Sequence, residues 1–356
     1  MHNSMKKILL MTAICAAAMV GCTNNDETPE QQEVNFSPLS YKSTRAIIGG
    51  SIYSITDPNF GVYAFYSAQG KSWSANLGEA SLYINDKEIK YVAGKKAWAS
   101  DTPTYWPLDG SLTFIAYSPK TLNATCVDKT LTFTDFVVKN TAQENQVDLL
   151  YTIPSDATGK TQNETNYGGV TGGAAGVGIK FRHALTQILV NVKVAADYGT
   201  EAVYKVNSIT LLGMNDKGTL VVAPDATATS VAPGATINGV NWTLATSTSP
   251  QVIYPTGISG TLTTGGALIG DPILVLPQDL SSTQQLQIKY QMTNGQGVTS
   301  STTRDIPLFK DGDFEELAMN KKITLNITIS ADEILYAPSV TDWDLSSEDY
   351  VDNTDF

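Results

Sequence analysis

Apolar and polar residues alternate along several short stretches of the chain. Within Leu286–Met292 the even-numbered residues are apolar and the odd-numbered residues are polar. The stretches Val190–Val194 and Ile323–Ile329 repeat this pattern. Because successive side chains of a strand point to opposite faces, such alternation predicts β-strands with one face in a core and the other in water. Further strands are predicted at Val62–Tyr66, Leu112–Tyr117, Val206–Leu212, Thr219–Val222 and Ile273–Leu276.

Signs of helices are few. No long stretch places apolar residues at the 3.6-residue spacing of an amphipathic helix, and Thr, Gly and Ser are abundant between the predicted strands. Many short strands separated by turn residues favour an all-β fold built from antiparallel β-sandwiches or barrels. A glycine-rich segment, Gly168–Gly178, precedes a strong pair of predicted strands. We therefore predict an N-terminal β-sandwich domain at residues 36–178 and a C-terminal β-sandwich domain at residues 179–356.

The first residues have the order of a secretory signal. Lys6-Lys7 precedes an apolar run, Ile8–Val20, which ends at Gly21-Cys22. This run is well short of the ~20 apolar residues that a membrane-spanning helix needs, and no later segment is continuously apolar over such a length. We predict that residues 1–21 are a signal peptide that is removed on export.

The segment Met19-Val20-Gly21-Cys22 resembles a lipobox, in which the chain is cut before a cysteine that then carries lipid. Cys22 is therefore the predicted lipidation site, carrying palmitate or related acyl chains, and the alternative is an ordinary signal peptide with an incidental cysteine. The residues that follow are polar and acidic, so residues 22–35 are predicted to form a flexible tether. Bacterial lipoproteins resemble one another in carrying several acyl chains, which suffices for stable attachment. The predicted location of this precursor is the cell outer membrane.

Charge and cysteine content narrow the classes of function. The formal net charge is −12, and the 23 basic residues are scattered, so a nucleic-acid surface is not predicted. Of the three cysteines, Cys15 leaves with the signal and Cys22 carries the lipid, which leaves Cys126 alone. An intrachain disulfide is therefore excluded, and the fold must be held by burial of apolar residues. Roughly 310 residues beyond the tether are enough for about two domains.

Residues that could carry catalysis or bind metals are scarce. The two histidines are His2, which is lost with the signal, and His183, for which a structural role is predicted. No Gly-x-Ser-x-Gly nucleophile elbow is present, and Pro154 replaces the first glycine of the phosphate loop suggested by Gly159-Lys160-Thr161. Pairs of carboxylates lack the full spacing of a calcium loop. These pairs are Asp311/Asp313, Glu315/Glu316, Asp342/Asp344 and Glu348/Asp349. We predict no catalytic residue, no metal site and no cofactor.

Five local motifs resemble those of the fimbrillin family, the shaft and accessory subunits of type V pili. The motifs are Phe114–Pro119, Asp148–Tyr151, Phe181–Leu185, Leu274–Gln278 and Val340–Trp343. Their order and spacing, together with the lipobox, support a resemblance over nearly the whole chain. The resemblance implies two tandem transthyretin-like β-sandwiches and a protein that is not an enzyme. It also places His183 in a recurring Phe-x-His-Ala-Leu signature at the start of the second domain.

The resemblance implies a route of maturation as well. In that family a lipoprotein precursor is cut by an arginine-specific protease after the tether and first strand, and Lys42-Ser-Thr-Arg45-Ala46 is similar to such a site. Cleavage between Arg45 and Ala46 would remove the first-strand segment 36–45 and uncover a groove with unpaired backbone groups. A strand of another subunit would fill this groove, and the polymer would grow by donor-strand exchange. Without the resemblance, Arg45 is a plain polar residue in an extended segment.

By the same resemblance, the donor strand is the segment 344–356, with apolar residues at Leu345, Val351 and Phe356. The run Ser346–Asp349 interrupts any alternation there, which leaves an anchor or accessory role open beside a shaft role. The implied partners are other pilus subunits, self or homologous, joined head to tail, together with the arginine-specific protease and the outer membrane. The implied final location is a fimbrium at the cell surface, with a contribution to cell adhesion.

Two other hypotheses come from the composition. The first is a surface glycan-binding lipoprotein, in which the sandwiches display some of the 5 Trp and 16 Tyr residues to a polysaccharide. Glycan binding that is lost when an exposed Trp is replaced by Ala would favour it, whereas aromatic residues in strands more often lie in a core or pair across strands. The second is a hydrolase that uses acidic pairs, which requires two carboxylates facing one cleft.

Overall fold

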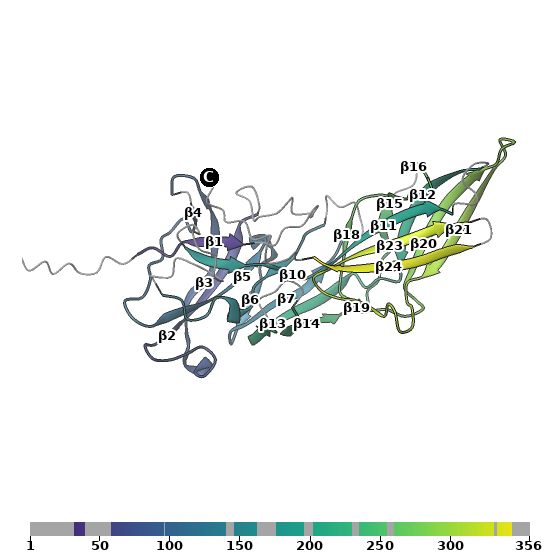
Figure 1. The fold of residues 1–356 in the computed structure, drawn as a ribbon. Helices are drawn as coiled ribbons and strands as arrows, with labels where there is room; N and C mark the ends of the chain where they lie inside the picture. The colour runs from purple at the N-terminus through teal and green to yellow at the C-terminus, as the bar shows by residue number, and fades with distance from the viewer. Residues whose placement is uncertain are drawn as a thin grey trace, which may run out of the picture. The chain divides into compact units, whose positions relative to one another are not determined.

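The computed structural model is built almost entirely from β-strands, which confirms the predicted all-β fold class (Figure 1). Short 3-10 helices lie at Leu77–Glu79 (η1), Lys120–Leu122 (η2) and Pro154–Asp156 (η4). The described residues are 32–39, 58–95, 97–139, 146–161, 176–195, 202–229, 235–254, 260–330 and 333–343. Every strand that alternation predicted is present, each within one or two residues of the predicted bounds or as part of a longer strand.

Eight strands form one hydrogen-bonded sheet, in the order β10-β8-β5-β2-β3-β4-β1-β9. Their bounds are Phe36–Leu39 (β1), Phe60–Ser67 (β2), Ser81–Val92 (β3), Ala97–Ala99 (β4), Ser111–Ser118 (β5), Leu150–Tyr151 (β8), Val177–Lys180 (β9) and Arg182–His183 (β10). β9 and β10 stand at opposite ends of this order, yet only Phe181 separates them in the chain. The sheet therefore folds back on itself into two facing layers.

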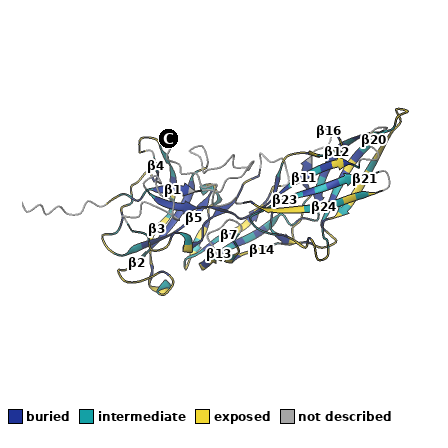
Figure 2. Cartoon of the chain, in the orientation of Figure 1, coloured by how far each residue is buried: buried dark blue, intermediate teal, exposed yellow. Residues whose placement is uncertain are grey.

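The two layers of this sheet enclose a buried apolar cluster, called here the N-terminal core. It consists of Val34, Phe36, Phe60, Val62, Ala64, Ile84, Ile89, Trp98, Trp106, Leu112, Phe114, Ala116, Leu150, Ala157, Val177, Ile179 and Phe181. The side chains of β2 at odd positions, such as Tyr63 and Phe65, face a different cluster, called the middle core. β2 is therefore buried on both faces, as its dark blue colour in Figure 2 shows.

A four-stranded sheet, in the order β14-β13-β7-β6, contributes to the middle core. Its strands are Thr125–Val127 (β6), Thr130–Val137 (β7), Lys217–Ala228 (β13) and Ile237–Leu244 (β14). β13 pairs with β7 in antiparallel register, with Leu220 opposite Phe133. The pairing of β7 with β13 therefore joins the two predicted domains by hydrogen bonds. Residue 178, the predicted boundary, lies within β9. The division into domains 36–178 and 179–356 stays a prediction.

The remaining strands surround a third cluster, the C-terminal core. One sheet has the order β17-β11-β23-β24 with β18 beside β11, a second has the order β15-β12-β20-β21 with β16 beside β12, and β19 pairs with β22. Their bounds are Thr186–Val194 (β11), Val203–Leu212 (β12), Gln251–Tyr254 (β15), Gly260–Thr261 (β16), Ala267–Leu268 (β17), Ile273–Val275 (β18), Gln278–Asp279 (β19), Gln285–Thr293 (β20), Thr299–Pro307 (β21), Glu316–Leu317 (β22), Lys321–Ile329 (β23) and Ile334–Asp342 (β24).

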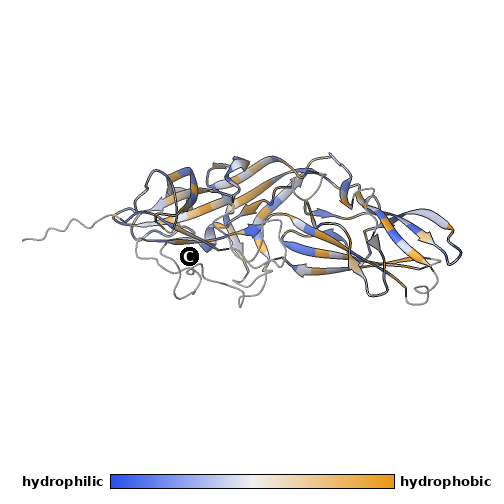
Figure 3. Ribbon diagram, turned by 90° about the horizontal axis from the view of Figure 1, so that it is seen from above, coloured by the Kyte–Doolittle hydropathy of each residue, from blue (hydrophilic) through white to orange (hydrophobic). Residues whose placement is uncertain are grey.

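Alternation along β20 and β23 places apolar side chains in the C-terminal core, as the sequence predicts. Leu286 and Ile288 of β20 are fully buried, whereas Lys289 between Ile288 and Tyr290 is exposed. Alternating orange and blue segments along the strands in Figure 3 show the same pattern. Each fully buried aliphatic side chain of this kind contributes about 1.5–3 kcal/mol relative to an exposed one. Burial therefore holds these sheets together.

The folded body begins earlier than the sequence predicts. The predicted tether runs to residue 35, but Val34 is buried in the N-terminal core and Glu33 forms an isolated β-bridge with Tyr105. Val34 and Phe36 stand two residues apart, so both point to the same face of an extended segment. A single apolar pair among polar residues is too short to register as a strand pattern. Described packing contacts therefore reach back to Glu33, within the segment that the sequence predicts as a tether.

Several predicted features lie outside the described residues. They are the signal peptide 1–21, the lipidation site Cys22, the cleavage site Arg45 and Ala46, and the donor segment 344–356 with Leu345, Val351 and Phe356. The predictions that concern them stay predictions. Within the part of the chain that the structure describes, no helix is long and apolar enough to cross a membrane.

Candidate functional site

β1 occupies an interior position in its layer of the sheet, between β4 and β9. It runs parallel to β9, with Phe36 opposite Val177 and Leu39 opposite Lys180. It runs antiparallel to β4, where Phe36 lies opposite Trp98. Removal of an interior strand leaves unpaired N–H and C=O groups on two neighbouring strands. The position that β1 fills, between β4 and β9 and above the N-terminal core, is called here the β1 slot.

Backbone hydrogen bonds extend the slot upstream of β1. The Val34 N–H donates to the Thr104 carbonyl at 2.7 Å, and the Val177 N–H donates to the Asn35 carbonyl at 2.7 Å. Glu33 pairs with Tyr105 on the side of Thr104. The segment 33–39 is therefore held from both sides, by the 97–105 region and by β9. The backbone hydrogen bonds of this short segment described above are therefore all made to other parts of the chain.

Two apolar side chains fix the segment to the core. Phe36 is 2% exposed, and its ring packs edge-to-face on Phe60 and Phe114, with centroids 6.0 and 5.6 Å away. Val34, two residues earlier, is buried on the same side. Edge-to-face pairs of this kind contribute about 0.5–1.5 kcal/mol beyond burial of area. Without β1, the slot would therefore contain an apolar pocket shaped for a ring at the position of Phe36.

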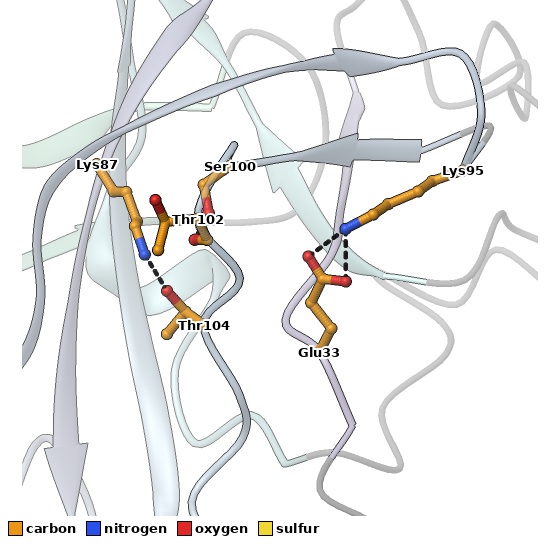
Figure 4. Close-up of polar contacts among 6 residues, drawn as sticks. All are labelled: Glu33, Lys87, Lys95, Ser100, Thr102 and Thr104. Atoms are coloured by element: carbon orange, nitrogen blue, oxygen red, sulfur yellow. Dashed lines mark hydrogen bonds and ion pairs between the residues drawn. The ribbon is translucent and has the colours of Figure 1, made fainter.

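Polar contacts surround the upstream end of the slot (Figure 4). Lys95, in the turn between β3 and β4, places its Nζ 2.6 Å from both carboxylate oxygens of Glu33. Lys87, on β3, donates from its Nζ to Oγ1 of Thr104, in the loop after β4, at 2.5 Å. The Lys95 and Glu33 side chains are 39% and 20% exposed, so their ion pair lies at the rim and not in the core.

Gly176, directly before β9, lies against the backbone of the first segment. Its φ is +149°, and a Cβ built on it would lie 2.9 Å from the carbonyl carbon of Asn35 and from the backbone nitrogen of Phe36. Glycine is the residue that tolerates both this backbone region and so close an approach. β9 and β1 are therefore packed closely because no side chain stands between them at this point.

Gly176→Ala is expected to lower the free energy of unfolding by about 2–3 kcal/mol, because the methyl group adds a clash with the segment before β1 to backbone strain. Urea denaturation of the intact chain measures the change. The matched control is Gly297→Ala, at φ +80° with open space around the new Cβ, which carries the backbone strain alone. Equal losses in the two variants would show that the close approach to β1 contributes nothing.

The motifs that suggested a family in the sequence meet at the middle core. His183 Nδ1 lies 2.9 Å from Asp148 Oδ2, and the His183 ring stacks on Trp343 with centroids 3.9 Å apart and planes 2° apart. All three residues are buried, and Asp148 and Trp343 are nearly or fully inaccessible to solvent. These residues come from three of the five motifs. The arrangement supports the structural role predicted for His183.

The other two motifs join the same region. Tyr117 of the first motif lies opposite Tyr151 in the pairing of β5 with β8. Leu274 of the fourth motif donates its N–H to Gln146 Oε1 at 2.7 Å, and Gln146 Nε2 donates to the Leu274 carbonyl at 3.0 Å. The five motifs therefore hold strands from distant parts of the chain together, and Phe114 of the first motif also contacts Phe36 in the β1 slot.

Cys126 has the environment of a packing residue and not of a reactive thiol. It is free, only partly accessible to solvent, and packs against the middle core. Burial, followed by the nearby charge of Asp86, raises the pKa of its thiol to about 12. Because the thiolate is the nucleophilic form, Cys126 is unreactive near neutral pH.

The tryptophans do not form a glycan-binding platform. Trp73, Trp98, Trp106 and Trp343 are all at most 7% exposed. Trp242, the fifth, is partly accessible, and its Nε1 donates to the Ala184 carbonyl at 2.8 Å. The tryptophans therefore do not support the glycan-binding hypothesis. Among the described residues, no group of three or more His, Cys, Asp or Glu side chains could hold a metal ion either.

Sequence reasoning located the first strand but not the residues that receive it. The walls of the slot at Trp98 and Val177 come from distant parts of the chain, and strand pairing across such separations leaves no local pattern. Val34 and Phe36 form only a single apolar pair, which is too short to predict that the strand begins before residue 36. No signal in the sequence indicates that Glu33 and Lys95 form an ion pair, because they stand 62 positions apart.

These features define a class of all-β proteins in which the first strand fills an interior position of a sheet. The described residues include no cluster of side chains that could bind a metal ion. A sequence model of the fimbrillin-like family matches residues 44–343, and the chain belongs to this family. The family consists of structural subunits and not of enzymes. The predicted resemblance is therefore confirmed.

One solved structure shows the same fold. A crystal structure of a fimbrial protein from Bacteroides vulgatus aligns with a TM-score of 0.59 at 16% identity, covering 87% of this chain and 99% of that one. At this identity the likeness shows the fold. The tip fimbrial protein Mfa3 from Porphyromonas gingivalis aligns with a TM-score of 0.41 at 11% identity, covering 88% of this chain and 100% of that one. A comparison with curated protein sequences finds no match.

Proposed function

We propose that this chain is a subunit of a surface pilus, exported as a lipoprotein and joined to other subunits by exchange of its first strand. The observation that carries the proposal is the interior position of β1 between β4 and β9. An edge strand could leave with little consequence, but an interior strand leaves a slot that is open along both walls. Family membership supports a structural role at the cell surface.

The free-energy difference between β1 and an incoming strand in the slot is expected to be small. An incoming strand restores the backbone hydrogen bonds of β4 and β9 and refills the pocket that Phe36 occupies. While β1 is covalently attached it competes at a very high effective concentration, and cleavage of the chain behind it removes that advantage. Cleavage after Arg45 would therefore convert a closed subunit into one that accepts a partner.

Polymer growth follows from the symmetry of such a contact. The donating segment and the receiving slot are different parts of the molecule, so each added subunit leaves a new free end and the assembly does not close. The segment 344–356 is the proposed donor, and Cys22 the proposed lipid attachment that holds the precursor at the outer membrane before cleavage. The mature subunit would then lie in a fimbrium and contribute to adhesion.

Treatment of the purified chain with an arginine-specific protease tests the proposal. The expected product begins at Ala46 and forms a ladder of assemblies with itself or with homologous subunits, seen by gel electrophoresis without heating. Arg45→Ala is expected to abolish both the cut and the ladder, and Lys42→Ala, at a site that such a protease does not cut, is the matched control. A chain that is cut after Arg45 and yet stays monomeric at high concentration, both alone and with homologous subunits, would contradict the proposal.

A further inference from the structure

Lys95 is placed to contact whatever strand fills the β1 slot. In the described structure its Nζ contacts both carboxylate oxygens of Glu33 at 2.6 Å (Figure 4). Lys95 belongs to the turn after β3, which stays with the body of the protein, whereas Glu33 belongs to the segment that the proposed cleavage releases. Departure of the first segment would therefore leave this ammonium group at the end of an open slot, with its carboxylate partner gone.

The slot also fixes where the carboxylate must stand. Glu33 directly precedes Val34, whose side chain enters the N-terminal core, and Phe36 enters the same core two residues later. An occupant must run parallel to β9 to repeat this register. The requirement is thus a carboxylate, then an apolar residue, then any residue, then an aromatic residue.

We propose that Lys95 makes the β1 slot selective for a strand that carries a carboxylate immediately before its first inward-facing apolar residue. This inference rests on the proposed function and specifies the chemistry of its partner. The occupant is a strand of a different polypeptide with this pattern. A strand with a lysine or arginine at the same place is rejected, because it brings like charge to Lys95.

The chain's own proposed donor segment meets the charge requirement, because Asp344 directly precedes Leu345, but it does not have the apolar spacing. Within 344–356 the apolar residues are Leu345, Tyr350, Val351 and Phe356, and no two of them stand two residues apart. A strand in the slot presents residues two apart to the core. One core position would therefore receive a polar side chain in every register, such as Ser347 when Leu345 fills the position of Val34. This mismatch favours a foreign strand over a second copy of the same chain.

The expected selectivity is moderate, since the ion pair lies at the rim. Lys95 and Glu33 are partly accessible to solvent, and exposed pairs of this kind change affinity by about threefold to fivefold. Reversal of one charge replaces attraction by repulsion, which gives a difference of about tenfold between acidic and basic strands. This range is well within the resolution of a competition experiment.

The experiment uses the full chain, cut after Arg45 with its first segment still bound, and follows replacement of that segment by labelled peptides. One peptide has the sequence of residues 32–41, a second carries Glu33→Lys, and a third has the sequence of residues 344–356. Fluorescence anisotropy gives the fraction bound at each concentration. The first peptide is expected to bind about tenfold more tightly than the second, and the third is expected to bind most weakly.

A charge reversal in the protein completes the test. Lys95→Glu is expected to invert the preference, so that the Glu33→Lys peptide binds more tightly than the native one. Lys90→Glu is the matched control, because Lys90 contacts Asp101 on the same pair of strands and not the slot. Its preference should be that of the unchanged protein. Thermal melting of each uncut variant shows that the fold is intact.

The outcomes separate the inference from the proposed function. Equal binding of the acidic and basic peptides, or an unchanged preference in Lys95→Glu, overturns the charge selection while exchange itself stands. Tighter binding of the 344–356 peptide than of the native peptide overturns the assignment to a foreign strand. If the native peptide fails to replace the bound segment at any concentration, the proposed function fails, and the selection fails with it.

Discussion

Phe36→Ala is expected to lower the free energy of unfolding of the intact chain by about 3–5 kcal/mol. Phe36 is 2% exposed and contacts two aromatic rings of the N-terminal core, so its truncation leaves a cavity between Phe60 and Phe114. The surrounding rings belong to central strands of the sheet and cannot easily collapse into this space. Denaturation in guanidinium chloride, followed by fluorescence, measures the loss.

The same substitution has a second expected effect on the cut protein. Phe36 lies in the first segment and not in β4 or β9, which form the walls of the slot. Its truncation therefore weakens the binding of the first segment and leaves the walls unchanged. After cleavage behind Arg45, the Phe36→Ala segment should leave faster and assembly should begin sooner. Phe36→Leu, which keeps most of the apolar volume, should change both quantities much less. A stable Phe36→Ala protein that releases its segment at the unchanged rate would contradict this account.

Alternation in the sequence predicted several of the strands that place one face in a core, but it missed others such as β7, which places Leu131 and Phe133 in the middle core. β20 and β23 were located because their apolar residues stand two apart and all enter the C-terminal core. β21 was missed, because its residues are almost all exposed and it is held by pairing with β20 along one edge. An alternating apolar pattern indicates that one face of a strand is buried, and it does not indicate hydrogen bonding. An edge strand that is exposed to solvent on both faces therefore shows no such pattern.

The candidate site was predictable only in part. The resemblance indicated that the first strand would be removed, and the structure places that strand between β4 and β9. The walls could not be predicted, since the partner of Phe36 on one side is Trp98 and on the other Val177. Register between distant strands depends on the packing of the whole core, which local patterns do not encode. For the same reason, the role of Lys95 becomes visible only in the folded chain.

The family motifs also acquire a physical meaning in the structure. Phe181–Leu185 and Asp148–Tyr151 are adjacent through the pairing of β10 with β8, which brings His183 opposite Leu150. Trp343 then closes this arrangement from the end of β24 by stacking on His183. The motifs mark the place where Trp343, near the end of the described chain, packs into the middle core. They do not by themselves identify the exchange site, although Phe114 of the first motif packs on Phe36 and Phe181 of the third lies in the N-terminal core.

Trp343→Ala is expected to be the other highly destabilising substitution, with a loss of about 3–5 kcal/mol. Trp343 is fully buried, stacks on His183 at 3.9 Å, and donates its backbone N–H to the Asn320 carbonyl at 3.0 Å. Truncation removes the ring that covers the buried pair of His183 and Asp148. Equilibrium unfolding of the intact chain in guanidinium chloride measures this loss.

Trp343→Phe provides the matched control. It keeps an apolar ring over His183, and the indole Nε1 that it removes has no hydrogen-bond partner among the described residues. Its loss should therefore be less than half that of Trp343→Ala. Because Trp343 lies in the middle core and Phe36 in the N-terminal core, neither Trp343 variant should change the release of the first segment from the cut chain. Faster release in Trp343→Ala would show that the two regions are coupled, and the β1 slot would then depend on the core that precedes the proposed donor segment.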